Sequence, residues 1–221
     1  MFPPFVLLIF GVFMKKGLFL TFEGQDGCGK TTQINLLIEY LKNKGYEVVL
    51  TREPGCAGLG EKIRSLLLDY DGEVSSVCES FLFLADRAQN VDIIVRKNIE
   101  EGRIVISDRH TDSSLAYQGY GRQLDVDRID MLNNIATSGL KPDLTYIFDI
   151  DVETSMARVG DKKDRIESAG KDFFDRVRNG YLEIAKKEPN RVKVINSVDS
   201  IENIHKQVVD LFVELEEKLL K

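Results

Sequence analysis

The sequence predicts an α/β fold in which a five-stranded parallel sheet lies between layers of helices. Two observations predict it. Short segments rich in β-branched and aromatic residues alternate along the chain with amphipathic segments of helical period, and each apolar segment ends where polar or charged residues begin. With 221 residues, the chain is long enough for one such domain, and no change in composition marks a second one.

The five strands are expected where Val, Ile, Leu, Phe, Tyr and Thr gather, because these residues suit buried parallel strands. In chain order they are Gly17–Glu23, Glu47–Thr51, Ile104–Ser107, Leu144–Asp149 and Val192–Asn196. Ligands bind at the carboxyl ends of the strands in sheets of this kind. The polar residues that follow each segment are therefore the first candidates for a functional site.

Helices are expected between the strands, where apolar residues recur at helical spacing. In chain order they are Lys30–Lys44, Leu59–Leu68, Glu79–Glu101, Val126–Ser138, Lys171–Lys187 and Ile201–Leu220. Gly45, Gly102 and Gly139 stand near the ends of three of them, where glycine often terminates a helix. We expect these helices to cover both faces of the sheet.

The charge balance argues against a nucleic-acid partner. The chain has 30 Lys+Arg and 36 Asp+Glu, a formal net charge of -6, which repels a phosphate backbone unless the basic residues share one face. A small anionic substrate held by a few arginines fits better. Cys28, Cys56 and Cys78 form no CxxC pair, and any disulfide scheme leaves one unpaired, so we expect a reducing compartment and a cytoplasmic protein.

Residues 2–13 are apolar, but this run is shorter than the roughly 20 residues that span a bilayer, so no membrane partner is expected. Lys15 and Lys16 follow the run, whereas a secretory signal carries its positive charge before it. We expect Met14 to be the biological start, residues 1–13 to be an upstream extension and residues 14–221 to form a single domain. The alternative is an apolar arm that packs on a partner.

A glycine-rich motif follows the first strand and precedes the first helix. It matches GxxxxGK[ST] and comprises Gly24, Gln25, Asp26, Gly27, Cys28, Gly29, Lys30 and Thr31, followed by Thr32. Such a P-loop surrounds a polyphosphate with backbone N–H groups and the N-terminus of a helix. Lys30 is expected at the β and γ phosphates of ATP, and the Thr31 hydroxyl on the bridging Mg²⁺. No NKxD motif supports a GTPase.

Further motifs resemble those of thymidylate kinases. They are Glu23-Gly24-Gln25-Asp26-Gly27, Thr51-Arg52-Glu53-Pro54-Gly55, Phe83-Leu84-Ala85-Asp86-Arg87, and Asp108-Arg109-His110 continuing into Ser113-Ser114-Leu115-Ala116-Tyr117-Gln118. The resemblance implies a P-loop NTPase fold and a homodimer that phosphorylates dTMP to dTDP with ATP, for dTTP biosynthesis. Cys56-Ala57-Gly58 departs from the family's usual glycine and threonine, which leaves the course of that loop open.

The resemblance also implies roles on the phosphate side of the acceptor. Asp26 reaches the 3′-hydroxyl of the sugar, while Arg52 and Arg109 bind the acceptor phosphate, for which a guanidinium is well shaped. Asp108 is a hard oxygen ligand suited to Mg²⁺ through bound water. Alternatively, Arg52 is a surface ion-pair partner, and Asp108 and Arg109 form a structural ion pair.

On the base side, the resemblance places Phe83 against the thymine ring and Arg87 on its carbonyl oxygen. Ser114 lies near the base edge, Tyr117 crowds the 2′ position of the sugar, and Gln118 completes the wall. An aromatic residue on an amphipathic helix more often packs in the hydrophobic core. The alternative for Phe83 is therefore a core residue that binds no ligand.

A charged, glycine-containing stretch from Arg158 to Glu167 is expected to form a lid over both nucleotides, at about residues 158–170. Some thymidylate kinases carry a basic residue at a variable position of the P-loop. This chain has Gln25, Asp26 and Cys28 at those positions, so it resembles the type whose lid supplies the catalytic charge. Arg165 is the first candidate, Lys162 and Lys163 are the next, and Arg158 is expected to flank the adenine.

The predicted catalytic set is therefore Lys30, Arg52, Asp108, Arg109 and Arg165. Two other functions remain open from the sequence. One is a kinase of a different nucleoside monophosphate, and the other is a nonenzymatic P-loop module that binds a nucleotide.

Overall fold

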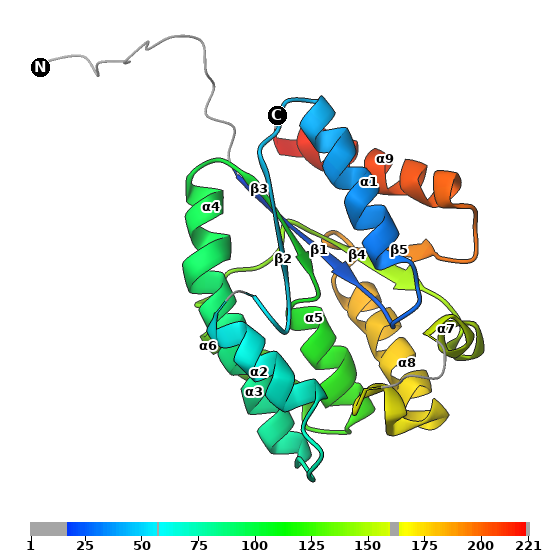
Figure 1. Ribbon diagram of the computed structural model, residues 1–221. Helices are drawn as coiled ribbons and strands as arrows, with labels where there is room; N and C mark the ends of the chain where they lie inside the picture. Colours follow the sequence, from blue (N-terminus) through cyan, green and yellow to red (C-terminus); the bar gives the residue numbers. More distant parts are fainter. Residues whose placement is uncertain (1–16, 57, 160–163, 220–221) are drawn as a thin grey trace, which may run out of the picture.

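A five-stranded parallel sheet forms the centre of the molecule (Figure 1). The structure is a computed structural model that describes residues 17–56, 58–159 and 164–219. The strands are β1 (Leu18–Glu23), β2 (Val48–Arg52), β3 (Ile104–Asp108), β4 (Leu144–Asp149) and β5 (Val192–Asn196). Their order across the sheet is β2-β3-β1-β4-β5, and every neighbouring pair is parallel. The predicted fold class and all five predicted strands are confirmed, with ends that differ by at most one residue.

Helices cover both faces of the sheet, as the sequence predicts. On one face α1 (Lys30–Asn43) and α9 (Ile201–Leu219) pack together and bury Leu20 and Phe22 of β1. On the other face lie α4 (Arg96–Glu100) and α8 (Lys171–Lys187). Alternate residues of a strand point to opposite faces, and Phe19 accordingly packs with Val95 and Val105. β1 is thus buried on both sides, which fixes the position of the loop that follows it.

The remaining helical elements lie at the carboxyl end of the sheet or beside it. They are α2 (Leu59–Leu68), α3 (Ser76–Asn90), α5 (Thr111–Ser114), α6 (Val126–Ala136), α7 (Val152–Val159), the π-helical η1 (Val91–Val95) and η2 (Leu115–Gly121), and the 3-10 turn η3 (Glu167–Ala169). The predicted helix Glu79–Glu101 is wrong at its start, because the Ser75 side chain accepts a hydrogen bond from Cys78 N and begins α3 at Ser76.

Helical turns between Thr111 and Gly121 were not predicted from the sequence. Most of η2 is buried, including Leu115, Tyr117, Gln118 and Gly119, so the segment has no polar face. A segment that is buried all around shows no amphipathic period, which is the signal that sequence reasoning depends on. α7 and η3 are also additions to the predicted elements.

Two expectations fall partly or wholly outside the described residues: the extension at residues 1–13, and the part of the lid at residues 160–163. Over the described ranges, no helix combines the length and apolar character needed to cross a membrane.

Candidate active site

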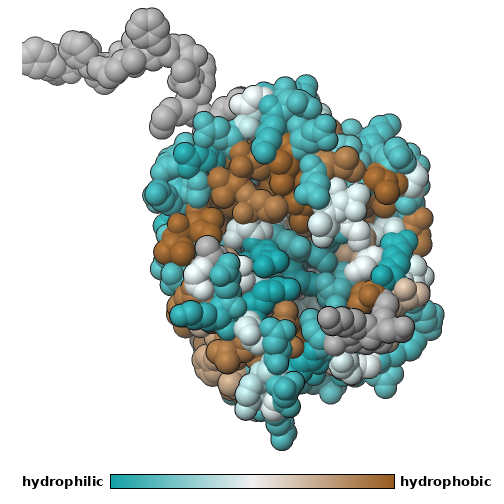
Figure 2. All heavy atoms as spheres, viewed as in Figure 1, coloured by the Kyte–Doolittle hydropathy of each residue, from teal (hydrophilic) through white to brown (hydrophobic). Residues whose placement is uncertain are grey.

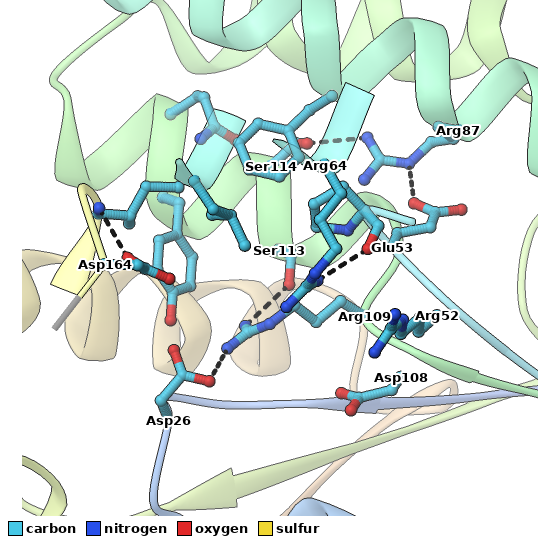
Figure 3. Close-up of a pocket in the computed structure, with 16 residues that line it drawn as sticks. Asp26, Arg52, Glu53, Arg64, Arg87, Asp108, Arg109, Ser113, Ser114 and Asp164 are labelled. Carbon is cyan, nitrogen blue, oxygen red and sulfur yellow. Dashed lines mark hydrogen bonds and ion pairs between the residues drawn. The ribbon is translucent and has the colours of Figure 1, made fainter. Parts of the chain in front are cut away.

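One pocket opens where the carboxyl ends of β1, β2 and β3 meet, among the hydrophilic side chains at the middle of the face shown in Figure 2. The register of the sheet aligns Asp108 with Phe22 on one side and with Arg52 on the other. Figure 3 shows Arg52 and Asp108 next to each other at this edge. The pocket brings together the residues predicted on the acceptor side: Asp26, Arg52, Phe83, Arg87, Asp108, Arg109, Ser114, Tyr117 and Gln118.

The P-loop has the backbone that its glycines allow. Gly24, Gly27 and Gly29 have φ of 134°, 74° and 92°, which non-glycine residues rarely adopt. No side chain caps α1, so the N–H groups of its first turn remain available to a ligand. Lys30 Nζ donates to the carbonyl oxygens of Gly24 and Gln25 at 3.1 and 3.0 Å, which holds the lysine inside the loop.

Arg109 connects the P-loop to the end of β3. Its Nη2 lies 2.9 Å from Asp26 Oδ1 and its Nη1 donates to Gly24 O at 3.0 Å, and Figure 3 shows the pair in the pocket. Burial raises the pKa of Asp26, but the charges of Arg109 and Lys30 and the hydrogen bond from Arg109 together outweigh burial and leave that pKa below its usual value. The guanidinium also lies 5.0 Å from the centre of the Tyr117 ring.

The buried carboxylate of Glu23 holds the backbone that carries Arg109, which has an uncommon φ of 72°. Glu23 accepts hydrogen bonds from His110 N at 2.7 Å, from Ser113 Oγ at 2.5 Å and from the Tyr181 hydroxyl at 3.0 Å. Burial raises the pKa of Glu23 to about 7. These hydrogen bonds hold His110 and Ser113, which follow Arg109 in the chain, and so fix the unusual backbone conformation of Arg109.

Arg87 lies at the pocket but is almost entirely engaged by the protein. It donates to Glu53 Oε2 (2.8 Å), Ser114 Oγ (2.8 Å), Asn133 Oδ1 (2.6 Å) and His110 O (2.7 Å). Of the five N–H groups of a guanidinium, these bonds use four, and the one that remains is on Nη2. Burial would raise the pKa of Glu53, but Arg87 and His110 outweigh it and lower that pKa to about 2.

The apolar part of the pocket is formed by Phe83, Leu68, Tyr117 and Ile166. The Tyr117 hydroxyl is buried and has no hydrogen-bond partner among the described residues. A buried hydroxyl without a partner costs free energy. Tyr117 lines the pocket beside the Arg109 guanidinium.

A family model described as thymidylate kinase matches residues 22–208, which include the P-loop, the pocket and the last strand. The chain belongs to the thymidylate kinase family. It is therefore an enzyme, and its reaction is the ATP-dependent phosphorylation of dTMP to dTDP.

Individual relatives agree over nearly the whole chain. A thymidylate kinase from Exiguobacterium sp. is 47% identical over 202 residues, covering 90% of this chain and 95% of that protein. One from Thermoanaerobacter sp. is 44% identical over 197 residues, covering 89% and 97%. The solved structure of thymidylate kinase from Ehrlichia chaffeensis has a TM-score of 0.74 and 40% identity, covering 89% of this chain and 98% of that one.

Arg165, the first candidate for the catalytic charge, is held by contacts within the protein. Its Nη2 lies 2.8 Å from Glu79 Oε2 and its Nε donates to Leu67 O at 2.9 Å. Both partners belong to helices beside the acceptor pocket, not to the P-loop. The contact of Arg165 with the transferred phosphoryl group stays a prediction. Lys162 and Lys163, the next candidates, lie outside the described residues.

Arg158 lies at the P-loop, where its Nη1 donates to Gly27 O at 3.3 Å. The adjacent contact from Ser155 Oγ to Asp26 O, at 2.7 Å, also fixes α7 to the loop. The adenine-side role of Arg158 stays a prediction.

Sequence reasoning missed Arg64, Glu53, Asp164 and Ile166, which all line the pocket. Arg64 lies on α2, and its Nη1 donates to Pro54 O at 2.9 Å beside Arg52 (Figure 3). A single arginine on an amphipathic helix carries no motif that could have revealed it. Asp164 and Ile166 flank Arg165 in the sequence, so the thymidylate kinase resemblance of that segment offered a signal for both.

The oxygen donors of the site suit Mg²⁺, the ion that accompanies ATP in phosphoryl transfer. Asp108 Oδ1 is buried and without a hydrogen-bond partner in the described part of the chain, although it lies at the pocket. Thr31 is the second residue of α1, is exposed, and lines a second pocket together with Asp108. A free carboxylate oxygen and a nearby hydroxyl suit a hydrated Mg²⁺.

Proposed function

We propose that this enzyme produces dTDP for dTTP biosynthesis by aligning Mg²⁺-bound ATP and dTMP on opposite sides of the Asp26–Arg109 pair. The observation that supports this most strongly is the 2.9 Å contact between those two side chains. It joins the phosphate-donor loop directly to the acceptor pocket. The attacking group is already a phosphate dianion, so no general base has to remove a proton from it. Catalysis therefore consists of alignment of the two substrates and neutralisation of charge.

On the donor side, the backbone of Gly24–Thr32 holds the triphosphate. Lys30 leaves its two loop carbonyls to bind the β and γ phosphates, and Arg158 flanks the adenine. Thr31 and Asp108 hold Mg²⁺, which when bound offsets the charge that develops on the phosphate oxygens.

On the acceptor side, Arg52 and Arg109 bind the phosphate of dTMP, and Asp26 binds the 3′-hydroxyl. Phe83 stacks on thymine, and the remaining N–H of Arg87 approaches a carbonyl oxygen of the base. Ser114 and Gln118 complete the wall near the base edge. The buried Tyr117 leaves little room for a 2′-hydroxyl, which favours deoxyribonucleotides.

We also propose that the enzyme is a cytoplasmic homodimer. Cys28, Cys56 and Cys78 are free thiols, as is usual in a reducing compartment. Large apolar side chains are exposed on α2, α3, η1 and α6, and we name these the apolar helix face: Leu66, Val77, Phe81, Ile93, Met131 and Ile135. α3 packs against α2 and α6, so the face is continuous enough to bury against a second copy.

Coupled measurement of ADP release tests the proposed reaction. With ATP and Mg²⁺, ADP release should be fast with dTMP and slow with dCMP, dGMP, dAMP or no acceptor. Lys30→Met should abolish ADP release, and that result would assign the activity to this P-loop. Release that does not depend on dTMP would contradict the proposal, and faster release with a different nucleotide would identify another kinase.

A further inference from the structure

Glu79 is a buried carboxylate outside the machinery that binds phosphate. It lies in the first turn of α3, and its side chain is 1% exposed. Its oxygens contact three side chains from two other parts of the chain. Gln118 Nε2 donates to Oε1 at 3.1 Å, Arg122 Nη2 donates to Oε2 at 3.0 Å, and Arg165 Nη2 forms an ion pair with Oε2 at 2.8 Å.

Arg165 has a second anchor at the end of α2. Its Nε donates to the carbonyl oxygen of Leu67 at 2.9 Å, in the last turn of that helix. Carbonyls in a last turn lack a partner within the helix, and a cation is favourable there. α2 has no basic residue of its own in that turn, so Arg165 supplies the cation from elsewhere in the chain.

The residues on each side of this cluster face the acceptor pocket. Asp164 and Ile166, the immediate neighbours of Arg165, line the pocket, and so does Gln118. Phe83 lies four residues after Glu79, on the same side of α3, and lines it as well. One carboxylate therefore connects three walls of the pocket: α3, η2 and the segment that contains Arg165.

We infer that Glu79 and Arg165 are positioning residues for dTMP: their ion pair holds Asp164 and Ile166 against α2 and α3, and so closes the acceptor pocket. The inference rests on the proposed function of this pocket. It also replaces the catalytic role that the sequence suggested for Arg165, because a guanidinium bound to Glu79 and to Leu67 O is not available to the transferred phosphoryl group.

The charges of the cluster favour this arrangement. Burial would raise the pKa of Glu79, but hydrogen bonds from Arg122 and Gln118 and the ion pair with Arg165 together outweigh burial and keep that pKa below its usual value. Without the carboxylate, two guanidinium groups would face each other with little water around them. Removing one partner of a buried pair leaves an uncompensated charge, so the segment around Arg165 should move away when Glu79 is neutralised.

Steady-state kinetics with each substrate varied separately distinguishes the two roles of Arg165. For Glu79→Gln and Arg165→Ala, we expect the KM for dTMP to rise about tenfold or more, with kcat within about threefold of the wild type and the KM for ATP unchanged. Arg165→Lys keeps the ion pair and should recover most of the affinity for dTMP. The double variant should be no worse than either single variant, because both remove the same contact.

Arg128→Ala is the matched control, since it removes an exposed arginine that pairs with Asp125 away from the pocket, and it should behave like the wild type. Thermal unfolding checks that each variant is folded. A fall in kcat of about a hundredfold or more for Arg165→Ala with unchanged KM for dTMP would restore the catalytic role and overturn the inference. Kinetics unchanged in both single variants would also overturn it. If wild-type ADP release did not depend on dTMP, the proposed function would fail before any variant was compared.

Discussion

Two of the four described arginines that line the acceptor pocket are balanced by a carboxylate of the protein. Arg87 pairs with Glu53 and Arg109 with Asp26. Among the described residues, Arg52 and Arg64 form no ion pair with a carboxylate. Burial lowers the pKa of Arg64, and the nearby positive charge of Arg52 lowers it further. These two cations are therefore the ones that a phosphate dianion would stabilise most.

The buried pair of Glu53 and Arg87 should make folding stability depend on pH. Glu53 has a pKa of about 2 in the fold and an ordinary value of 4.5, so its ionisation stabilises the fold above pH 4.5 and this stabilisation is lost as the pH falls toward 2. Glu53→Gln should lower the free energy of unfolding by about 3–5 kcal/mol at pH 7. That difference from the wild type should shrink by about 2 kcal/mol at pH 3.

Urea unfolding at the two pH values measures this change. Glu214→Gln, which alters an exposed carboxylate on α9, should track the wild type at both. A difference for Glu53→Gln that stays constant from pH 7 to pH 3 would show that the Glu53 carboxylate is not held ionised by its partners.

Residue identities could be predicted from the sequence more fully than residue partners. The resemblance of the motifs to those of thymidylate kinases predicted residues that the structure gathers in one pocket, because each motif directly follows a strand or recurs on one helix face. It could not show that Arg87 contacts Asn133, which is 46 positions away, or that Arg165 contacts Glu79. The partner of a long side chain depends on the tertiary structure. A charged residue in a motif therefore does not indicate which carboxylate will lie beside it.

At the scale of elements, the wall of the pocket depends on the close approach of α8 to η2. Gly180 on α8 faces Tyr120, and Gly121 of η2 faces Phe173 and Val177 of α8. A Cβ atom on Gly180 would lie 2.8 Å from atoms of the Tyr120 side chain. Glycine is therefore required within a helix where propensity alone would favour alanine.

Gly180→Ala should destabilise the fold by about 1–3 kcal/mol, because overpacking outweighs the roughly 1 kcal/mol that alanine contributes to a helix interior. Asn179→Ala, at the preceding exposed position, is the control and should be neutral or slightly stabilising. Urea unfolding of both variants provides the comparison. A Gly180→Ala protein as stable as Asn179→Ala would mean that the two elements are not packed this closely.

Element types were predictable where one face is polar and one is apolar, as in α1, α8 and α9. η2 was missed because its buried residues leave no such contrast, and the start of α3 was misplaced because the Ser75 cap was not recognised. The spacing of apolar residues shows neither a capping hydrogen bond nor a segment that is buried on all sides, so it could not reveal either feature.

At the scale of the whole molecule, the apolar helix face should determine the oligomeric state. It includes Phe81, which is 56% exposed, and Ile135, which is 65% exposed, on helices grouped at one side of the molecule (Figure 1). Side chains of this size gain free energy when a second copy covers them. None of them lines the acceptor pocket, so the proposed dimer contact would leave that pocket uncovered.

Phe81→Glu should convert the proposed dimer into a monomer, because it places a charge at the centre of an apolar contact. Sedimentation velocity at micromolar protein measures the change. Val198→Glu, at an exposed apolar residue after β5, is the control and should leave the dimer intact. A wild-type protein that sediments as a monomer would contradict the proposed homodimer.

The two substrate sites differ in how they are distributed along the chain. The P-loop is one contiguous stretch between β1 and α1, whereas the acceptor pocket combines residues from β2, α3, β3 and η2. Substitutions on α3 or η2 can therefore reshape recognition of the base while the donor loop stays intact. This separation gives the fold an evolutionary freedom: one mode of ATP binding can be inherited unchanged while the choice of phosphate acceptor diversifies.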